Sequence, residues 1–221
     1  MMGKEEMTAA FIYRQIQHET NLSEVVLCVL HHPCSSTLRC AEPQRKWMLN
    51  FDKVKEIWNS QHPDVATPAS VDGLTYKNDH LCMVELKSGV EFLRHEPLAN
   101  KKNLTDKQVE VFQNKIERRI GTFDFRKKLS DSIRICEDIV NIKNLHELFP
   151  IEYLVVTDVQ KNENPLLNLT ENLNFLSGNT SDWVSYYMKT LQCHASTTEV
   201  KGITPKIVCC KEFDSFLERL R

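Results

Sequence analysis

Apolar residues recur every three to four positions in several segments of the chain, which is the spacing of an amphipathic helix. We therefore predict helices over residues 5–20, 44–60, a segment capped by Thr105, 125–142, 183–191 and 213–221. Their expected core-facing residues include Phe11, Ile12, Ile16; Trp47, Phe51, Val54, Trp58; Val109, Val111, Ile116; Leu129, Ile133, Cys136 and Val140.

Shorter runs rich in β-branched and aromatic residues predict strands. Residues 70–87 read as two strands that flank the polar tetrad Lys77-Asn78-Asp79-His80, and residues 151–157 read as a buried strand. A last strand is expected over residues 205–210. The apolar run 23–30 fits either a strand or the core of a helix, because periodicity does not separate the two in so short a segment.

The order of these elements predicts an α/β fold, with a mixed central β-sheet flanked by helices. A chain of 221 residues suits one domain. We expect a single domain over residues 1–221, in which 1–60 form an N-terminal helical region. Residues 61–160 would then hold the hairpin, helices and strand, and 161–221 a C-terminal helix, strand and helix.

The composition narrows the classes of protein to consider. No stretch approaches the roughly 20 apolar residues of a membrane span, and the first residues lack the apolar core of a secretory signal. Eight cysteines without such a signal are typical of reduced thiols, so we expect a cytoplasmic protein and no membrane. The formal net charge of −2 does not give the basic surface of a strong non-specific nucleic-acid binder, so local patches or a partner would have to hold a nucleic acid.

The hairpin brings two acidic residues together. With Asn78-Asp79 as a two-residue turn, opposed residue numbers sum to 157, which places Asp72 across from Glu85 and Lys87 on the face of Glu85. The surrounding strand residues are apolar on both faces: Val71, Leu74, Leu81, Cys82, Met83, Val84 and Leu86. Two opposed carboxylates in such a setting repel each other, and a cation would relieve the conflict. Oxygen ligands from two strands suit Mg²⁺ or Mn²⁺, beside which Lys87 could activate a water or steady charge on a phosphate.

Val71-Asp72-Gly73, twelve residues and Glu85-Leu86-Lys87 resemble the D…(D/E)xK signature of the PD-(D/E)XK, or restriction-endonuclease-like, nuclease superfamily. The helix before the hairpin and the helix and strand after it also resemble that core. The resemblance implies Asp72 and Glu85 as metal ligands, Glu85 and Lys87 as residues that place the attacking water, and phosphodiester hydrolysis in DNA or RNA. It further implies a polar residue from the following helix, either Lys128 or Ser132, and an early glutamate, either Glu19 or Glu42.

Other interpretations of the same residues stay open. Glu85 and Lys87 could form a strand-end ion pair while Asp72 caps a turn, in a non-catalytic interaction subunit with the same fold. Cys28, His31, His32, Cys34 and Cys40 could bind zinc in an adaptor, with Cys193-His194 and Cys209-Cys210 as distant partners, although the spacing matches no zinc motif. If the protein is a nuclease, its charge and size favour an effector subunit that works with a protein partner or as a homo-oligomer, for instance in bacterial antiviral defence.

Overall fold

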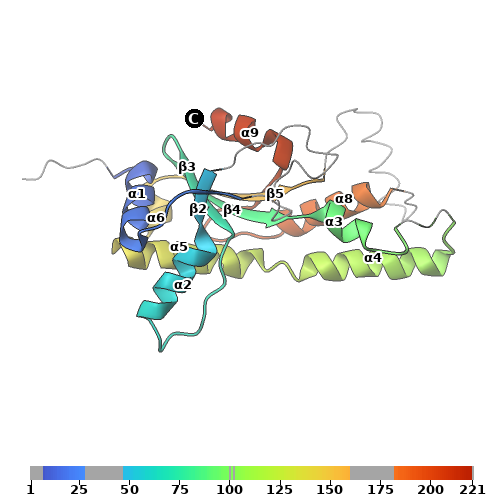
Figure 1. Ribbon diagram of the computed structural model, residues 1–221. Helices are drawn as coiled ribbons and strands as arrows, with labels where there is room; N and C mark the ends of the chain where they lie inside the picture. The colour runs from blue at the N-terminus through green and yellow to red at the C-terminus, as the bar shows by residue number, and fades with distance from the viewer. Residues whose placement is uncertain (1–6, 28–46, 100, 102, 160–181, 221) are drawn as a thin grey trace, which may run out of the picture.

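The computed structural model describes residues 7–27, 47–99, 101, 103–159 and 182–220. They form an α/β arrangement around an open six-stranded sheet of order β1-β2-β3-β4-β5-β6 (Figure 1). Neighbours from β1 to β4 are antiparallel, and β4, β5 and β6 are parallel. The predicted α/β class with a mixed sheet is therefore confirmed. The strands are β1 (Val25–Val26), β2 (Trp47–Asn50), β3 (Gly73–Lys77), β4 (His80–Lys87), β5 (Ile151–Thr157) and β6 (Lys206–Cys209).

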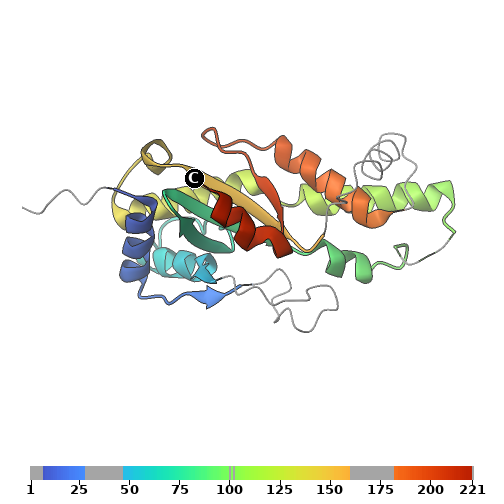
Figure 2. The same cartoon turned by 90° about the horizontal axis from the view of Figure 1, so that it is seen from above.

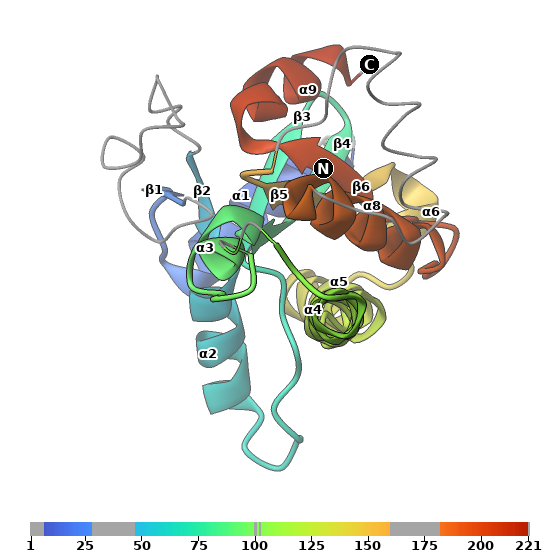
Figure 3. The same ribbon diagram turned by 90° about the vertical axis from the view of Figure 1, so that its right-hand side faces the viewer.

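Helices cover both faces of this sheet. Helix α9 lies on one side of the strands, and α5 with the collinear α4 lies on the other (Figures 1 and 3). The helices are α1 (Ala9–Thr20), α2 (Phe51–Gln61), α3 (Gly89–Arg94), α4 (Asp106–Gly121), α5 (Phe125–Val140), α6 (Leu145–Leu148), α8 (Trp183–Ser196) and α9 (Phe213–Arg219). No helix in the described part of the chain is both long and apolar enough to cross a lipid bilayer.

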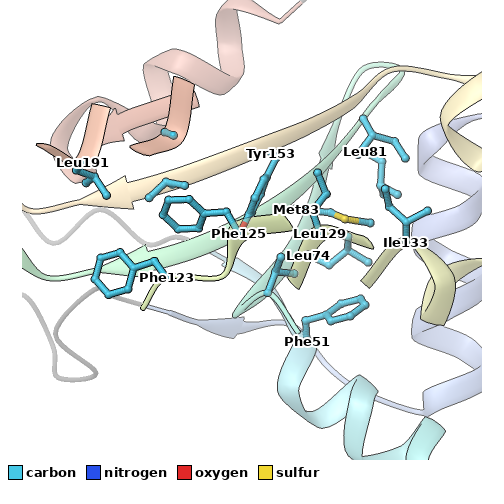
Figure 4. Packing of buried hydrophobic residues seen from close by; sticks show 14 of the residues in the cluster. Phe51, Leu74, Leu81, Met83, Phe123, Phe125, Leu129, Ile133, Tyr153 and Leu191 are labelled. Carbon is cyan, nitrogen blue, oxygen red and sulfur yellow. The ribbon is translucent and has the colours of Figure 1, made fainter. Parts of the chain in front are cut away.

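The alternation of side chains along β4 divides the core in two. Leu81 and Met83 belong to the larger cluster, in which they pack with residues of α1, α5 and α8. Cys82, Val84 and Leu86 point to the opposite face and belong to the smaller cluster beneath α9. Figure 4 shows part of the larger cluster, where strand residues face the apolar stripe of α5. Glu85 follows Met83 at a spacing of two, so it lies on the α5 side of the sheet.

The hairpin has the register expected from the sequence. Lys77 pairs with His80, and Gly73 pairs with Val84, so opposed residue numbers sum to 157 throughout. The turn consists of Asn78 and Asp79, of which Asn78 takes a positive φ of 51°. Asparagine adopts this conformation more readily than most residues, which explains its place at the first turn position.

The helix predicted over residues 44–60 was partly wrong. Residues Trp47–Asn50 form β2, and α2 starts at Phe51, because the Asn50 side chain accepts a hydrogen bond from the Lys53 backbone N–H and caps the helix. Trp47 is 51% exposed rather than part of the core, whereas Trp58 is buried as expected. The N-terminal region over residues 1–60 therefore also contains strands β1 and β2 and is not only helical.

The two long helices begin where the sequence predicts them. Thr105 caps α4 in a reciprocal capping box with Gln108. The stripe predicted for this helix was wrong at one position: Val111 is 53% exposed, and Phe112 supplies the buried side chain instead. All four stripe residues predicted for α5 are buried. Apolar character alone does not show which of the adjacent residues Val111 and Phe112 faces the core, because the face that a helix buries depends on the elements it packs against.

Asp158, just after β5, fixes α3 to the end of the sheet. Its carboxylate accepts hydrogen bonds from the Ser88 hydroxyl at 2.6 Å and from the backbone N–H groups of Gly89 and Val90 at 2.8 and 3.1 Å. These groups open α3, whose N-terminal N–H groups would otherwise lack partners. Asp158 therefore links strand β5 to the helix that follows β4.

Asp158→Ala is expected to lower the free energy of unfolding by about 2 kcal/mol, because three donors lose a charged acceptor. Chemical denaturation monitored by circular dichroism measures the change. Asp64→Ala, at an exposed aspartate between α2 and β3, is the matched control and should stay within about 0.5 kcal/mol of the parent protein. Equal losses in both variants would contradict this role for Asp158.

Candidate active site

Asp72 lies immediately before β3 and is held against β4. Its backbone N–H donates to the Val84 carbonyl at 2.9 Å, and one carboxylate oxygen accepts from the Leu86 N–H at 2.6 Å. The hairpin pairs end at Gly73 and Val84, and the Asp72 charge raises the pKa of Glu85, so the two acids lie close together just beyond the last pair. The backbone geometry thus keeps this half-buried carboxylate at the carboxyl-terminal end of β4, next to the second acid.

Glu85 is a fully buried acid with two cationic partners. Its Oε1 atom accepts from Lys128 Nζ at 2.6 Å and also forms an ion pair with Lys87 Nζ. Its second oxygen, Oε2, is buried and has no hydrogen-bond partner among the described residues. Burial raises the pKa of Glu85, the nearby Asp72 raises it further, and the two lysines oppose these effects.

Lys128 reaches Glu85 from the first turn of α5. Burial alone would lower the pKa of this amine, but the charges of Glu85, Asp72 and Asp52 and the hydrogen bond to Glu85 raise it overall. Lys128 is therefore a protonated partner of the buried acid. The positive charge that offsets the two neighbouring carboxylates is supplied, in this structure, by Lys87 and Lys128.

The structure thus brings together the four residues singled out from the sequence, Asp72, Glu85, Lys87 and Lys128. Ser132, the alternative on the same helix, plays a different role: its hydroxyl accepts from the Val71 N–H at 3.0 Å and steadies the segment that leads to Asp72.

Neither candidate for the early glutamate has a described contact with the two acids. Glu19 pairs with the exposed His18, and Glu42 lies outside the described residues.

Two residues near the acids were not singled out from the sequence. Asp52, at the start of α2, accepts from the Ser70 hydroxyl at 2.6 Å and contributes to the raised pKa of Lys128. Tyr153 of β5 has a buried hydroxyl without a hydrogen-bond partner among the described residues. Burial raises the pKa of Tyr153, and the charges of Glu85 and Asp72 raise it further, which places its hydroxyl in the electrostatic field of the site.

A pocket of about 630 Å³ opens beside the two lysines. One wall comes from the end of β4, Ser88 and α3, and the other comes from the junction of α4 and α5. The lining residues are Leu86, Lys87, Ser88, Glu91, Phe92, His95, Arg119, Thr122, Phe123 and Lys128. Lys87 and Lys128 therefore touch both the buried acid and the pocket, so they connect Glu85 to the open space.

The residues present fit a divalent ion of the Mg²⁺ type. Such ions are bound through one or two carboxylates and keep several waters and substrate phosphates as further ligands. The unpartnered Oε2 of Glu85 and the carboxylate of Asp72 are the two protein groups available for this purpose. The described residues hold no group of three or more His, Cys, Asp or Glu side chains placed to bind a metal, so a fully protein-ligated site is not found there.

The cysteine and histidine segment from Cys28 to Cys40 lies outside the described residues. Of its suggested partners, His194 is engaged elsewhere, since its Nε2 atom lies 2.9 Å from the Phe123 carbonyl oxygen. Cys209 and Cys210 are buried at the end of β6 and Cys193 is exposed on α8.

Comparisons with known proteins add no further assignment. No family model, no curated protein and no solved structure matches the chain.

Proposed function

We propose that the protein is a nuclease that hydrolyses phosphodiester bonds in DNA or RNA with Mg²⁺ or Mn²⁺. The observation that carries the proposal is the buried carboxylate of Glu85, which has one unpartnered oxygen, lies near Asp72 and is linked to an open pocket by two lysines. Perturbed ionisable groups that converge next to a pocket are typical of catalytic sites.

The arrangement of elements supports the resemblance to the PD-(D/E)XK superfamily. A helix precedes the hairpin, and a helix and a strand parallel to β4 follow it, as the resemblance to that core requires. Asp72 immediately precedes the first strand of the hairpin, and Glu85 and Lys87 come from the second. We therefore include a restriction-endonuclease-like core in the proposal.

Each of the four site residues has its own role in the proposed hydrolysis. Asp72 and Glu85 would hold the divalent ion, which would supply polarisation of the scissile phosphate and a lowered pKa of a bound water. Lys87 lies at the boundary of Glu85 and the pocket, where it orients the attacking water and donates to the phosphate oxygen on which negative charge develops. Lys128 neutralises Glu85 before the substrate arrives and offers a second positive charge to the phosphate.

The charges on the site make ion and substrate binding interdependent. In the described state the two carboxylates are balanced by two ammonium groups, so a divalent ion alone meets little net negative charge. A substrate phosphate adds negative charge next to Lys87 and Lys128 and weakens their ion pairs with Glu85. The nucleic acid and the ion are therefore expected to bind better together than separately.

The substrate itself would be held by local groups, because the chain as a whole is slightly acidic. Arg119 is exposed near the end of α4 and lines the pocket, and Arg126 and Lys127 are exposed at the start of α5. A protein partner or a second copy of the chain would supply further contacts, as expected for an effector subunit.

A cleavage assay tests this function. Purified protein is incubated with single-stranded and duplex DNA and with RNA, in Mg²⁺, in Mn²⁺ and in excess chelator. The proposal predicts strand breaks that depend on the metal and are lost in chelator. Intact substrates under all of these conditions would favour the non-catalytic interaction subunit.

A further inference from the structure

The pocket beside Lys87 and Lys128 has two chemically different walls. The α3 wall carries Glu91, Phe92 and His95, and the wall at the junction of α4 and α5 carries Arg119 and Phe123. Helices α3 and α4 lie at the same end of the molecule, beyond the carboxyl end of β4 (Figures 1 and 2). The pocket therefore has an aromatic and acidic side and a cationic side. Lys128 belongs to the cationic side, and Lys87, at the end of β4, has its amine 5.1 Å from the centre of the Phe123 ring on that side.

Arg119 is available to bind an anion. It is exposed, and its guanidinium lies 5.5 Å from the centre of the Phe123 ring. No carboxylate lies within ion-pair distance of Arg119 in the described part of the chain. Lys87 Nζ lies 5.1 Å from the centre of the same ring, so Phe123 holds two cations near the pocket. A phosphate group at this wall would meet Arg119, Lys87 and Lys128.

Phe92 offers an aromatic surface on the opposite side. Its ring is half-buried and tilted against Tyr187 at a centroid distance of 6.0 Å, which fixes its orientation from behind. Glu91, next to it, disfavours a second phosphate on this side and can accept a hydrogen bond from a base amino group. The two walls therefore suit a ligand with a planar apolar portion at one end and a phosphate at the other.

We infer that this pocket binds one unpaired nucleotide of the substrate strand, with its base against Phe92 and its phosphate against Arg119 and the two lysines. The volume of about 630 Å³ lies within the range of roughly 300–1,000 Å³ that is common for small-molecule sites. A paired and stacked base does not present its face to a side chain, so the nucleotide must be single-stranded or turned out of the duplex. The inference rests on the proposed nuclease function and adds a preference for unpaired substrate.

Binding measurements in chelator separate recognition from cleavage. Fluorescence anisotropy is recorded with labelled oligodeoxythymidine, with oligouridine of the same length, and with a blunt DNA duplex. The protein is expected to prefer the unpaired strands. Phe92→Ala should weaken their binding by about 5- to 150-fold, the usual loss for one stacked base, with little change for the duplex. The thymidine and uridine arms distinguish a DNA from an RNA substrate.

Conservative and neighbouring variants control this test. Phe92→Tyr should restore the preference for unpaired strands, since the aromatic face is kept. Arg119→Ala should reduce binding of the unpaired strands more than Arg118→Ala, which removes an exposed arginine one position away on the same helix that does not line the pocket. Thermal melting shows that each variant is folded.

The outcomes separate the two proposals. Equal binding of duplex and unpaired strands by the parent protein, or equal losses on both forms in Phe92→Ala, would overturn this inference. Metal-dependent cleavage could still persist in that case and would keep the proposed function. Failure to bind or cleave any of the oligonucleotides, with metal present or absent, would contradict both.

Discussion

Asp72→Asn is expected to reduce metal-dependent cleavage by on the order of 10³-fold, since an ion that supplies several kcal/mol of transition-state stabilisation loses one of its two carboxylate ligands. The fold should survive, because the asparagine oxygen can still accept the hydrogen bond from the Leu86 N–H. Initial rates of cleavage at saturating Mn²⁺ measure the effect. Asp72 is a better position for this test than Glu85, whose charge also holds Lys87 and Lys128.

The matched control for this variant is Asp79→Asn. Asp79 is an exposed aspartate in the turn of the same hairpin, at the end remote from the site. Its substitution should leave the rate unchanged. An Asp72→Asn protein that cleaves as fast as the Asp79→Asn protein would remove Asp72 from the metal site.

Lys87→Ala should reduce the cleavage rate by about 10²–10³-fold, the usual cost of losing one preorganised donor at a developing negative charge. Lys87 ends β4 and its side chain borders the pocket, so its loss leaves the strand pairing intact. The parent and variant proteins must be purified in parallel, because trace nucleases are a common contaminant.

Lys77→Ala is the control for this second variant, since Lys77 ends the partner strand β3 next to the turn. It should cleave at the parent rate. If Lys87→Ala cleaves as fast as the Lys77 control, the activity resides in another protein or in another region of the chain.

The hairpin was the element of the fold that the sequence predicted best, for a local reason. A two-residue turn and strict alternation fix which residues oppose each other, so the pairing of Gly73–Lys77 with residues 80–84 follows from counting. The start of α2 was harder to predict. Trp47, Met48 and Leu49 continue the apolar pattern of the helix backwards, and only the cap by Asn50 separates strand from helix.

The rest of the site depends on contacts that sequence patterns do not encode. Lys128 came from the resemblance alone, because its contact with Glu85 spans 43 residues and requires α5 to cross the sheet at one particular place. Tyr153 lies in the electrostatic field of the acids because β5 pairs in parallel with β4, in a register that no turn fixes. The pocket is formed by α3, a short helix that was not predicted, and by the corner between α4 and α5.

The most direct test of a metal site at Asp72 and Glu85 is a crystal structure with Mn²⁺ and a short single-stranded oligonucleotide, with the metal located by anomalous scattering. Such a site predicts an anomalous peak between the two carboxylates, at about 2.1 Å from an oxygen of each, which is the distance typical of Mg²⁺-type sites. It also predicts that Lys87 and Lys128 contact the phosphate next to the ion. A structure in which the oligonucleotide is bound, no peak lies between these acids, and both lysines still pair with Glu85 would contradict it.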